Sequence, residues 1–267
     1  MSDQRTQRTL RTSGASRTSR TLRTPILRLL VSVANAAEAS AALAGGADVI
    51  DAKNPLAGAL GAVSVDMLRD IHATVAGTRL VTAAIGDAAD EAEIEQTASR
   101  FAAAGAAFVK VGFAGITSAN RIEALIKAAV RGVDAWSPTG VIAVAYADAD
   151  RVASLAARSV CDVAARAGAT GVLLDTADKS GPGLRGLMAP AALARWVTDA
   201  HESGLLVAVA GKLTAEDLAF VHDAGADIAG VRGAACEGGR RGRVSSDRVA
   251  LLRALCSQAL AGPSFQG

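Results

Sequence analysis

Short runs of β-branched and other apolar residues alternate along the chain with longer, alanine-rich amphipathic stretches. The short runs predict strands buried on both faces, and the stretches between them predict helices. The predicted strands are 27–33, 47–53, 79–86, 107–112, 141–147, 171–177, 205–211 and 228–233. The predicted helices are 36–44, 64–75, 92–104, 119–131, 152–166, 189–203, 214–223 and 247–259.

A repeated Ala-Gly signal marks alternate helix-to-strand junctions. Its glycines, separated by 59, 63 and 57 residues, are Gly46, Gly105, Gly168 and Gly225. Glycine at a helix C-terminus lets the backbone turn left-handed before a strand begins. A spacing near 60 equals two βα units, so the chain predicts a parallel sheet closed into a single (β/α)₈ barrel, a TIM barrel. A doubly wound open sheet is the alternative, but no G-x-G-x-x-G follows the first predicted strand.

The chain divides into a low-complexity beginning and one long patterned region. Its 267 residues fit the roughly 250 that one such barrel needs. Residues 1–26 are rich in arginine and threonine and contain little apolar surface, so we expect a disordered N-terminal extension. The barrel is expected over 27–259 and a short tail over 260–267. A targeting peptide can have a similar composition, but Arg28 interrupts the apolar run that a secretion signal requires.

Charge and cysteine usage argue against several classes of protein. Residues 1–28 carry seven arginines against one acidic residue, whereas the rest carries 21 basic and 25 acidic side chains. The barrel is therefore slightly acidic, which argues against nucleic-acid binding. No apolar run reaches the roughly 18 residues of a membrane-spanning helix. Three widely spaced cysteines and the lack of ligand motifs predict no disulfide framework, no metal site and a cytoplasmic location.

Polar side chains follow the predicted strands at their carboxyl ends, where a barrel of this kind carries its chemistry. Asp51 and Lys53 end the second strand, and residues two apart share a face, so both are expected to face the barrel interior. There Asp51 can hydrogen-bond and orient the Lys53 amine. The other strand ends contribute Lys110, Asp148, Asp175, Lys179, Gly211, Lys212, Arg232 and Gly233.

The distribution of lysine points to amine chemistry. The chain has 23 arginines and only five lysines, of which only Lys127 lies within a predicted helix. Where only a solvated positive charge is needed, this chain uses arginine. A group that must lose its proton cannot be arginine, because guanidinium stays charged. Burial among other cations lowers the pKa of a lysine and makes it a nucleophile or an acid–base catalyst. For any single lysine, an ion pair with a nearby aspartate is the alternative.

A phosphate site is predicted at the ends of the last two strands, where barrel loops often bind phosphate through backbone N–H groups. The segments 210–212 and 230–233 provide two cations, and their glycines let a phosphate approach the backbone closely. Asp148, at the end of the fifth predicted strand, is also predicted to bind substrate. Ordinary turn glycines are the alternative. The basic run 237–243 is expected to be a solvated loop, with a second phosphate site as the less favoured alternative.

Five segments carry a resemblance to a known family. They are LLVSVANAAEASAALAGGADVIDAKNPLAGALGA (29–62), FVKVGFAG (108–115), VAYADADR (144–151), LLDTADKSG (173–181) and IAGVRGAAC (228–236). Together they resemble the (5-formylfuran-3-yl)methyl phosphate synthases, also called 4-(hydroxymethyl)-2-furancarboxaldehyde-phosphate synthases. The similarity runs over about residues 27–257, and DAKNP-x-x-G-x-LGA is its specific signature.

The resemblance implies a (β/α)₈ lyase that condenses two molecules of glyceraldehyde 3-phosphate. Phosphate and water are lost, giving a phosphorylated furan aldehyde for methanofuran-type cofactors. The implied Schiff-base lysine is Lys53 and the implied proton acceptor is Lys110, supported by Asp51, Asp175 and Lys179. The implied phosphate rim consists of Gly211, Lys212, Arg232 and Gly233, with Lys212 standing where a serine-like residue is expected.

The residues by themselves leave two other functions open. A class I aldolase or a triose-phosphate isomerase-like enzyme would use the same lysine and phosphate rim. A non-catalytic barrel that binds phosphorylated sugars would need no lysine at position 53. No cofactor is expected, because a Schiff base already provides the electron sink. The expected partners are a phosphorylated small molecule and further copies of the chain in a homo-oligomer, with neither a membrane nor nucleic acid.

Overall fold

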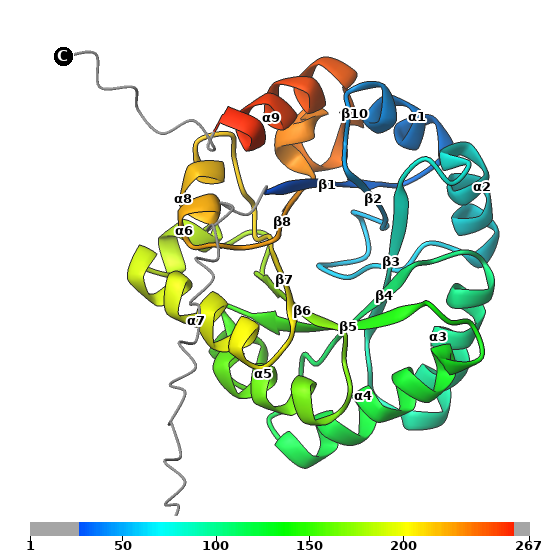
Figure 1. Cartoon of the computed structure of the whole chain (residues 1–267), viewed down its shortest axis with the longest axis vertical. Helices are drawn as coiled ribbons and strands as arrows, with labels where there is room; N and C mark the ends of the chain where they lie inside the picture. Colours follow the sequence, from blue (N-terminus) through cyan, green and yellow to red (C-terminus); the bar gives the residue numbers. More distant parts are fainter. Residues whose placement is uncertain (1–26, 259–267) are drawn as a thin grey trace, which may run out of the picture.

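The computed structural model describes residues 27–258 and shows a closed barrel of parallel strands surrounded by helices (Figure 1). Each strand pairs with the next, and β8 pairs with β1 to close the ring. The strands are β1 (Arg28–Val33), β2 (Val49–Ala52), β3 (Leu80–Asp87), β4 (Phe108–Gly112), β5 (Gly140–Tyr146), β6 (Gly171–Asp175), β7 (Leu206–Val209) and β8 (Ile228–Val231). The predicted (β/α)₈ barrel is confirmed. The expected extension 1–26 and tail 260–267 lie outside the described residues.

Helices follow the strands and pack around the outside of the barrel (Figure 1). They are α1 (Ala36–Ala44), α2 (Val65–Val75), α3 (Glu91–Ala103), α4 (Ala119–Asp134), α5 (Ala157–Arg166), α6 (Leu184–Leu187), α7 (Pro190–Glu202), α8 (Asp217–Asp223) and α9 (Ser246–Gln258). Shorter elements are the 3₁₀ turns η1 (Ala149–Val152), η2 (Gly233–Ala235) and η3 (Gly239–Arg241), and the strands β9 (Cys236–Glu237) and β10 (Arg243–Val244). The last two form an antiparallel ribbon between β8 and α9 that the sequence pattern did not predict.

Two helices begin later than the pattern predicts, for local reasons. The helix predicted from residue 152 begins at Ala157, because the preceding 3₁₀ turn ends at Ala153, whose φ of 48° is left-handed. The helix predicted from Thr214 begins at Asp217. The carboxylate of Asp217 accepts hydrogen bonds from the backbone N–H and the hydroxyl of Thr214, and these bonds fix a turn ahead of the helix.

The Ala-Gly repeat has the backbone conformation that its sequence predicts. Its four glycines follow their helices with φ of 83° at Gly46, 99° at Gly105, 82° at Gly168 and 84° at Gly225. Residues with a side chain rarely adopt this conformation. At Gly105 a Cβ atom would also lie 2.5 Å from the ring of His72, so the position excludes a side chain on two grounds.

Strand side chains alternate between an outer layer packed under the helices and an inner layer that fills the barrel. Leu29, Val31 and Ile50 belong to the outer layer, whereas Leu30 and Leu173 belong to the inner one. Toward the carboxyl ends of the strands, polar side chains replace the inner apolar layer. The buried polar residues there include Ser32, Asp51, Lys53, Thr82, Lys110 and Asp175. The fold thus collects the polar strand ends predicted from the sequence in one place.

The loop after β2 covers part of the barrel mouth. Ala59 and Leu60 from this loop pack with Tyr146 in the inner apolar cluster, and Figure 1 shows the loop crossing the barrel interior. A hydrogen bond of 2.8 Å from the Asn54 backbone N–H to the Gly61 carbonyl closes the loop. The cavity that remains reaches the surface beside β7, β8 and α9.

Candidate active site

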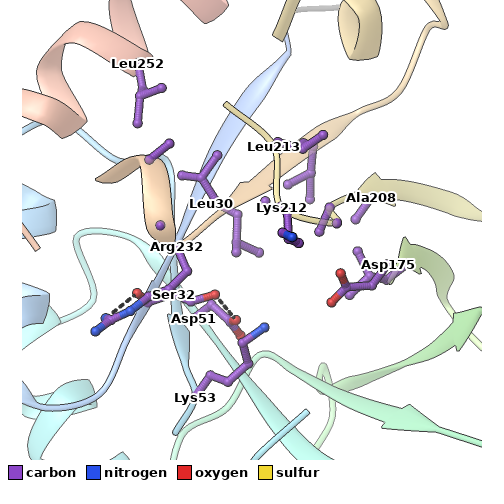
Figure 2. Close-up of a pocket in the computed structure, with 18 of the residues that line it drawn as sticks. Leu30, Ser32, Asp51, Lys53, Asp175, Ala208, Lys212, Leu213, Arg232 and Leu252 are labelled. Carbon is purple, nitrogen blue, oxygen red and sulfur yellow. Dashed lines mark hydrogen bonds between the residues drawn. The ribbon is translucent and has the colours of Figure 1, made fainter. Parts of the chain in front are cut away.

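A cavity of about 560 Å³ opens at the carboxyl ends of the strands (Figure 2). Apolar strand residues such as Leu30, Ile142 and Leu173 line its base. Nine of the ten predicted site residues line it: Asp51, Lys53, Lys110, Asp175, Lys179, Gly211, Lys212, Arg232 and Gly233. The exception is Asp148. The structure therefore brings nine of the predicted residues together at one cavity, although several side chains make contacts that the sequence did not predict.

Asp51 is a fully buried carboxylate held by three other strands. Ser32 of β1 donates its hydroxyl to one carboxylate oxygen at 2.8 Å, as Figure 2 shows, and Thr82 of β3 donates to the other at 2.8 Å. The Lys110 amine of β4 forms an ion pair with this second oxygen. Because both members of the pair are buried, Asp51 compensates a lysine charge that burial alone would disfavour. Asp51 is therefore a fixed anion that positions Lys110.

Lys53 differs from its neighbours because its amine is unpaired. It directly follows β2 and has 7% of its surface exposed, and Figure 2 shows the side chain turned into the cavity. Its Nζ atom has no hydrogen-bond or ion-pair partner among residues 27–258, since both nearby carboxylates pair with other lysines. This arrangement corrects the expectation that Asp51 hydrogen-bonds the Lys53 amine. The shorter aspartate side chain reaches the adjacent strands instead.

Burial lowers the pKa of Lys53 from 10.5 to about 8. The positive charges of Lys110 and Lys179 lower it as well, while Asp175 and Asp51 act in the opposite direction. With this pKa, about one tenth of the amine is unprotonated at pH 7, compared with well under one thousandth for an ordinary lysine. Lys53 is therefore available as a nucleophile near neutral pH.

A second aspartate–lysine pair, with a buried aspartate and a half-buried lysine, lies at the end of β6. One oxygen of Asp175 accepts hydrogen bonds from the Lys179 amine at 2.6 Å and from the Thr176 backbone N–H at 2.7 Å. Burial raises the pKa of Asp175, but the charges of Lys179 and Lys53 and these hydrogen bonds outweigh that effect and hold the pKa below its ordinary value. Asp175 is thus ionised and provides negative charge close to the Lys53 amine.

Direct phosphate binding would require the guanidinium of Arg232 to point into the cavity. It points elsewhere in the structure. It forms a buried ion pair with Glu38 of α1. Its other donors reach the carbonyl oxygens of Ser32 at 3.0 Å, Arg240 at 3.1 Å and Gly242 at 2.8 Å. All five N–H groups are used, and Figure 2 shows the guanidinium on the side of the site away from Asp175. The side chain holds the segment after β8 in place, and its part in a phosphate rim stays a prediction.

Asp148 is the predicted site residue that the structure places outside the cavity lining. Its two carboxylate oxygens accept hydrogen bonds from the backbone N–H groups of Ala177 at 2.7 Å and Asp178 at 2.8 Å. The side chain is buried and both oxygens are engaged. Asp148 therefore stabilises the loop that carries Lys179, and the expected contact with substrate is not supported.

The predicted phosphate rim lies beside the cavity and presents backbone groups. Gly211 and Lys212 have positive φ values of 108° and 58°. Several rim N–H groups donate no hydrogen bond within the described part of the chain: those of Gly211, Lys212, Leu213, Gly233 and Ala234. The exposed Lys212 side chain donates to the Gly181 carbonyl. Grouped, unpaired N–H groups bind anions, so the rim suits a phosphate through its backbone.

Most of the basic segment 237–243 is exposed, as expected of a solvated loop, but Arg240 departs from that expectation. The ribbon of β9 and β10 encloses the turn η3, and the half-buried Arg240 side chain lines the cavity. Its Nη2 atom donates to the Gly58 carbonyl at 2.7 Å. Arg241 and Arg243 are exposed.

Sequence reasoning missed Ser32 and Thr82, and it included Arg240 only within the less favoured second phosphate site of the basic run 237–243. Ser32 faces inward near the end of β1, and Thr82 of β3 faces inward beside Asp51, so the alternation used for the other strands could have identified them. Arg240 had no comparable signal. Its placement depends on the ribbon and on the bond from Arg232 to its carbonyl oxygen.

The remaining reactive residue types form no second site in the described ranges. The three cysteines are buried and separate, and burial raises the pKa of Cys161 to about 12 and that of Cys256 to about 11. Within residues 27–258, no group of three or more His, Cys, Asp or Glu side chains is placed to hold a metal ion. None of the helices in this range combines the length and apolar character needed to cross a membrane.

Comparison with known sequences identifies close relatives over nearly the whole barrel. A family model described as 4-HFC-P synthase matches residues 29–253. The (5-formylfuran-3-yl)methyl phosphate synthase of Methanopyrus kandleri is 42% identical over 222 residues, which cover 82% of this chain and 93% of the relative. The synthase of the same name from Methanocaldococcus jannaschii is 40% identical over 219 residues, covering 80% and 93%.

Solved structures share the architecture at much lower identity. A 3-hexulose-6-phosphate synthase superposes with a TM-score of 0.60 at 21% identity, covering 86% of this chain and 99% of that one. KGPDC from Streptococcus mutans gives a TM-score of 0.61 at 15% identity, covering 88% and 99%. At such identities the likeness extends to the barrel fold alone.

Proposed function

Because the chain belongs to the 4-HFC-P synthase family, we propose that it makes 4-(hydroxymethyl)-2-furancarboxaldehyde phosphate from two molecules of glyceraldehyde 3-phosphate. One phosphate and two waters leave, which balances the atoms of the two trioses against the furan. The name of the Methanopyrus kandleri relative, (5-formylfuran-3-yl)methyl phosphate synthase, describes a furan phosphate as well. We assign the chain to the lyases, to methanofuran-type cofactor synthesis and to the cytoplasm.

The observation that carries this proposal is the unpaired Lys53 amine. It lies beside the rim of unpaired N–H groups, and its pKa is about 8. A triose phosphate whose phosphate is held at the rim would have its aldehyde within the same cavity. Substrate binding then replaces a bimolecular encounter with a reaction between oriented groups, which lowers the barrier considerably.

In the proposed first step, the Lys53 amine attacks the aldehyde carbon and water leaves, forming an imine. The protonated imine accepts electrons, so the proton on the neighbouring carbon becomes acidic. Its removal gives an enamine whose carbon attacks the aldehyde of the second triose. A hydroxyl group of the second triose then attacks the imine carbon and displaces the Lys53 amine, which closes the ring without taking up water. Loss of phosphate and of a second water completes the furan. These steps involve no net oxidation or reduction.

Lys110 is proposed to move the protons in these steps. It comes from β4, and its amine is held by Asp51 in the cavity floor. Asp51 compensates the charge of Lys110 whenever the amine carries the proton, and Ser32 and Thr82 keep that carboxylate in place. A positioned acid–base group of this kind contributes about 100- to 10,000-fold to the rate.

Asp175 and Lys179 are proposed to support the imine. The ionised Asp175 carboxylate stabilises the positive charge of the protonated imine on Lys53. Lys179 keeps Asp175 ionised and provides a hydrogen-bond donor at the cavity wall.

Product analysis tests the proposed function directly. Incubation of the purified chain with glyceraldehyde 3-phosphate should generate furan ultraviolet absorbance and free phosphate in equal amounts, and Lys53→Ala should abolish both. A class I aldolase or isomerase would transform the triose without releasing phosphate. A binding protein would leave it unchanged.

A further inference from the structure

Arg240 is a cavity-lining cation whose hydrogen-bonding capacity is mostly unused. A guanidinium has five N–H donors, and one of those of Arg240 reaches the Gly58 carbonyl at 2.7 Å. The other four have no partner within the part of the chain that the structure describes, and no carboxylate there forms an ion pair with the side chain. Arg232, by contrast, uses all five donors.

The backbone of Arg240 is held in place by buried contacts. Arg232 donates to the Arg240 carbonyl at 3.1 Å and to the Gly242 carbonyl at 2.8 Å, while Glu38 holds Arg232 from α1. The chain also passes close to the rim, because a Cβ atom on Gly233 would lie 3.6 Å from the Arg240 nitrogen. An arginine fixed in this way loses less conformational entropy on binding a ligand than a free surface arginine.

The guanidinium of Arg240 contacts the loop after β2, whereas the unpaired rim N–H groups follow β7 and β8. Arg240 follows β8, whereas its partner Gly58 belongs to the loop after β2, and β1 lies between β8 and β2 in the barrel. Gly211 and its neighbours follow β7, on the other side of β8. Adjacent strands are about 4.8 Å apart, so the end of β2 lies about two strand spacings from the end of β8. The cavity thus presents unused donors over β7 and β8 and, from Arg240, toward the loop that follows Lys53's strand.

The electrostatic surroundings of Arg240 favour an anion. Burial lowers the pKa of Arg240, the charge of Arg232 acts in the same direction, and Asp175 opposes them. Guanidinium nevertheless stays charged in proteins. A partly buried cation with unused donors is stabilised by a phosphate, which can accept two parallel hydrogen bonds from the planar guanidinium.

We propose that Arg240 binds the phosphate of one of the two substrate molecules while the rim N–H groups bind that of the other. The identity of the ligand rests on the proposed function, whereas the presence of a second anion site rests on the geometry of Arg240. By binding this phosphate, Arg240 would restrict the second substrate of the condensation to phosphorylated aldehydes.

Binding of sn-glycerol 3-phosphate tests the site without any chemistry, because this compound has no carbonyl to form an imine. Calorimetry should show two molecules bound per chain in the wild type and one in Arg240→Gln. Arg241→Gln, a change at the adjacent exposed arginine, should still bind two. Arg240→Lys keeps the charge and should bind the second molecule about tenfold more weakly than the wild type, since one charged hydrogen bond is lost. One or no molecule bound by the wild type, or two bound equally well by Arg240→Gln, would overturn the inference.

Turnover separates this inference from the proposed function. If the wild type makes the furan, Arg240→Gln should lower kcat/KM for glyceraldehyde 3-phosphate about 10- to 100-fold, and Arg241→Gln should change it less than about twofold. If the wild type makes no furan, the proposed function fails, yet the calorimetric comparison still decides whether Arg240 holds a second phosphate.

Discussion

Asp51 and Lys110 form a buried ion pair across the barrel floor, whereas Lys53, two residues after Asp51, has no such partner in the described structure. These two lysines therefore have different properties although both line the cavity. The aspartate holds Lys110 in position for proton transfer. Lys53 is left as the amine that burial makes nucleophilic.

Replacing Asp51 by asparagine should remove the anion that positions Lys110. The structure loses a buried ion pair, and the amine of Lys110 has no compensating charge. We expect kcat/KM for furan formation to fall about 100- to 10,000-fold, the range for loss of a positioned acid–base group. Ser32→Ala, which removes only one hydrogen bond to the same carboxylate, should have a much smaller effect. An Asp51→Asn enzyme within twofold of the wild type would contradict the assignment.

The rate of imine formation should depend on pH through Lys53. The unprotonated amine is the nucleophile, so the rate should rise about tenfold per pH unit below about 8 and level off above it. Rapid borohydride trapping of the substrate adduct at a series of pH values measures this rate. Lys110→Met removes a positive charge that lowers the pKa of Lys53, so its inflection should move to higher pH. A wild-type inflection near 10.5 would show that Lys53 is an ordinary lysine.

Lys53→Met should abolish activity but stabilise the fold. Below about pH 8 the amine is charged in both the folded and the unfolded chain, and the folded chain disfavours that charge. The lowering from 10.5 to about 8 corresponds to roughly 3 kcal/mol, so an apolar side chain should raise the free energy of unfolding by about 1–3 kcal/mol at pH 7. The gain should disappear as the pH rises from 8 to 10.5. Urea denaturation at pH 7 and at pH 10 measures both values, and a variant less stable than the wild type at pH 7 would contradict the prediction.

Because Arg232 and Glu38 form one buried ion pair, replacing either residue should destabilise the fold. Breaking a buried pair from either side leaves an uncompensated charge, so Arg232→Met and Glu38→Gln should each lower the free energy of unfolding by about 3–5 kcal/mol. Because the two changes remove one interaction, the double variant should lose much less than the sum of the single losses. Denaturation of the three variants measures this coupling. Additive effects would show that the two side chains stabilise the fold independently and would contradict the assignment.

The fold and the position of the site were accessible from the sequence because they depend on local periodicity. Alternation along each strand places Asp51 and Lys53 inward, and the Ala-Gly repeat marks where strands begin. The scarcity of lysine in an arginine-rich chain singled out Lys110 and Lys179 at the same cavity. These features depend on the residue itself and its immediate neighbours.

The partners of the polar side chains were not accessible in the same way. Arg232 and Glu38 are 194 residues apart in sequence, and nothing local distinguishes an arginine that pairs with a helix from one that faces the cavity. Asp148 lies at a strand end as Asp175 does, yet it accepts two backbone N–H groups from a neighbouring loop. Arg240 lies in a basic run typical of solvated loops, and only the tertiary contacts of its backbone bring it to the cavity.

The most direct test of the account is to identify the residue that reacts with substrate. Glyceraldehyde 3-phosphate and borohydride should be added together to the wild type, followed by proteolysis and mass mapping of the modified peptide. The account predicts one reduced adduct, located on Lys53 and absent from Lys53→Arg. An adduct on Lys110, Lys179 or Lys212 in its place, or no adduct in an enzyme that still forms the furan, would contradict it.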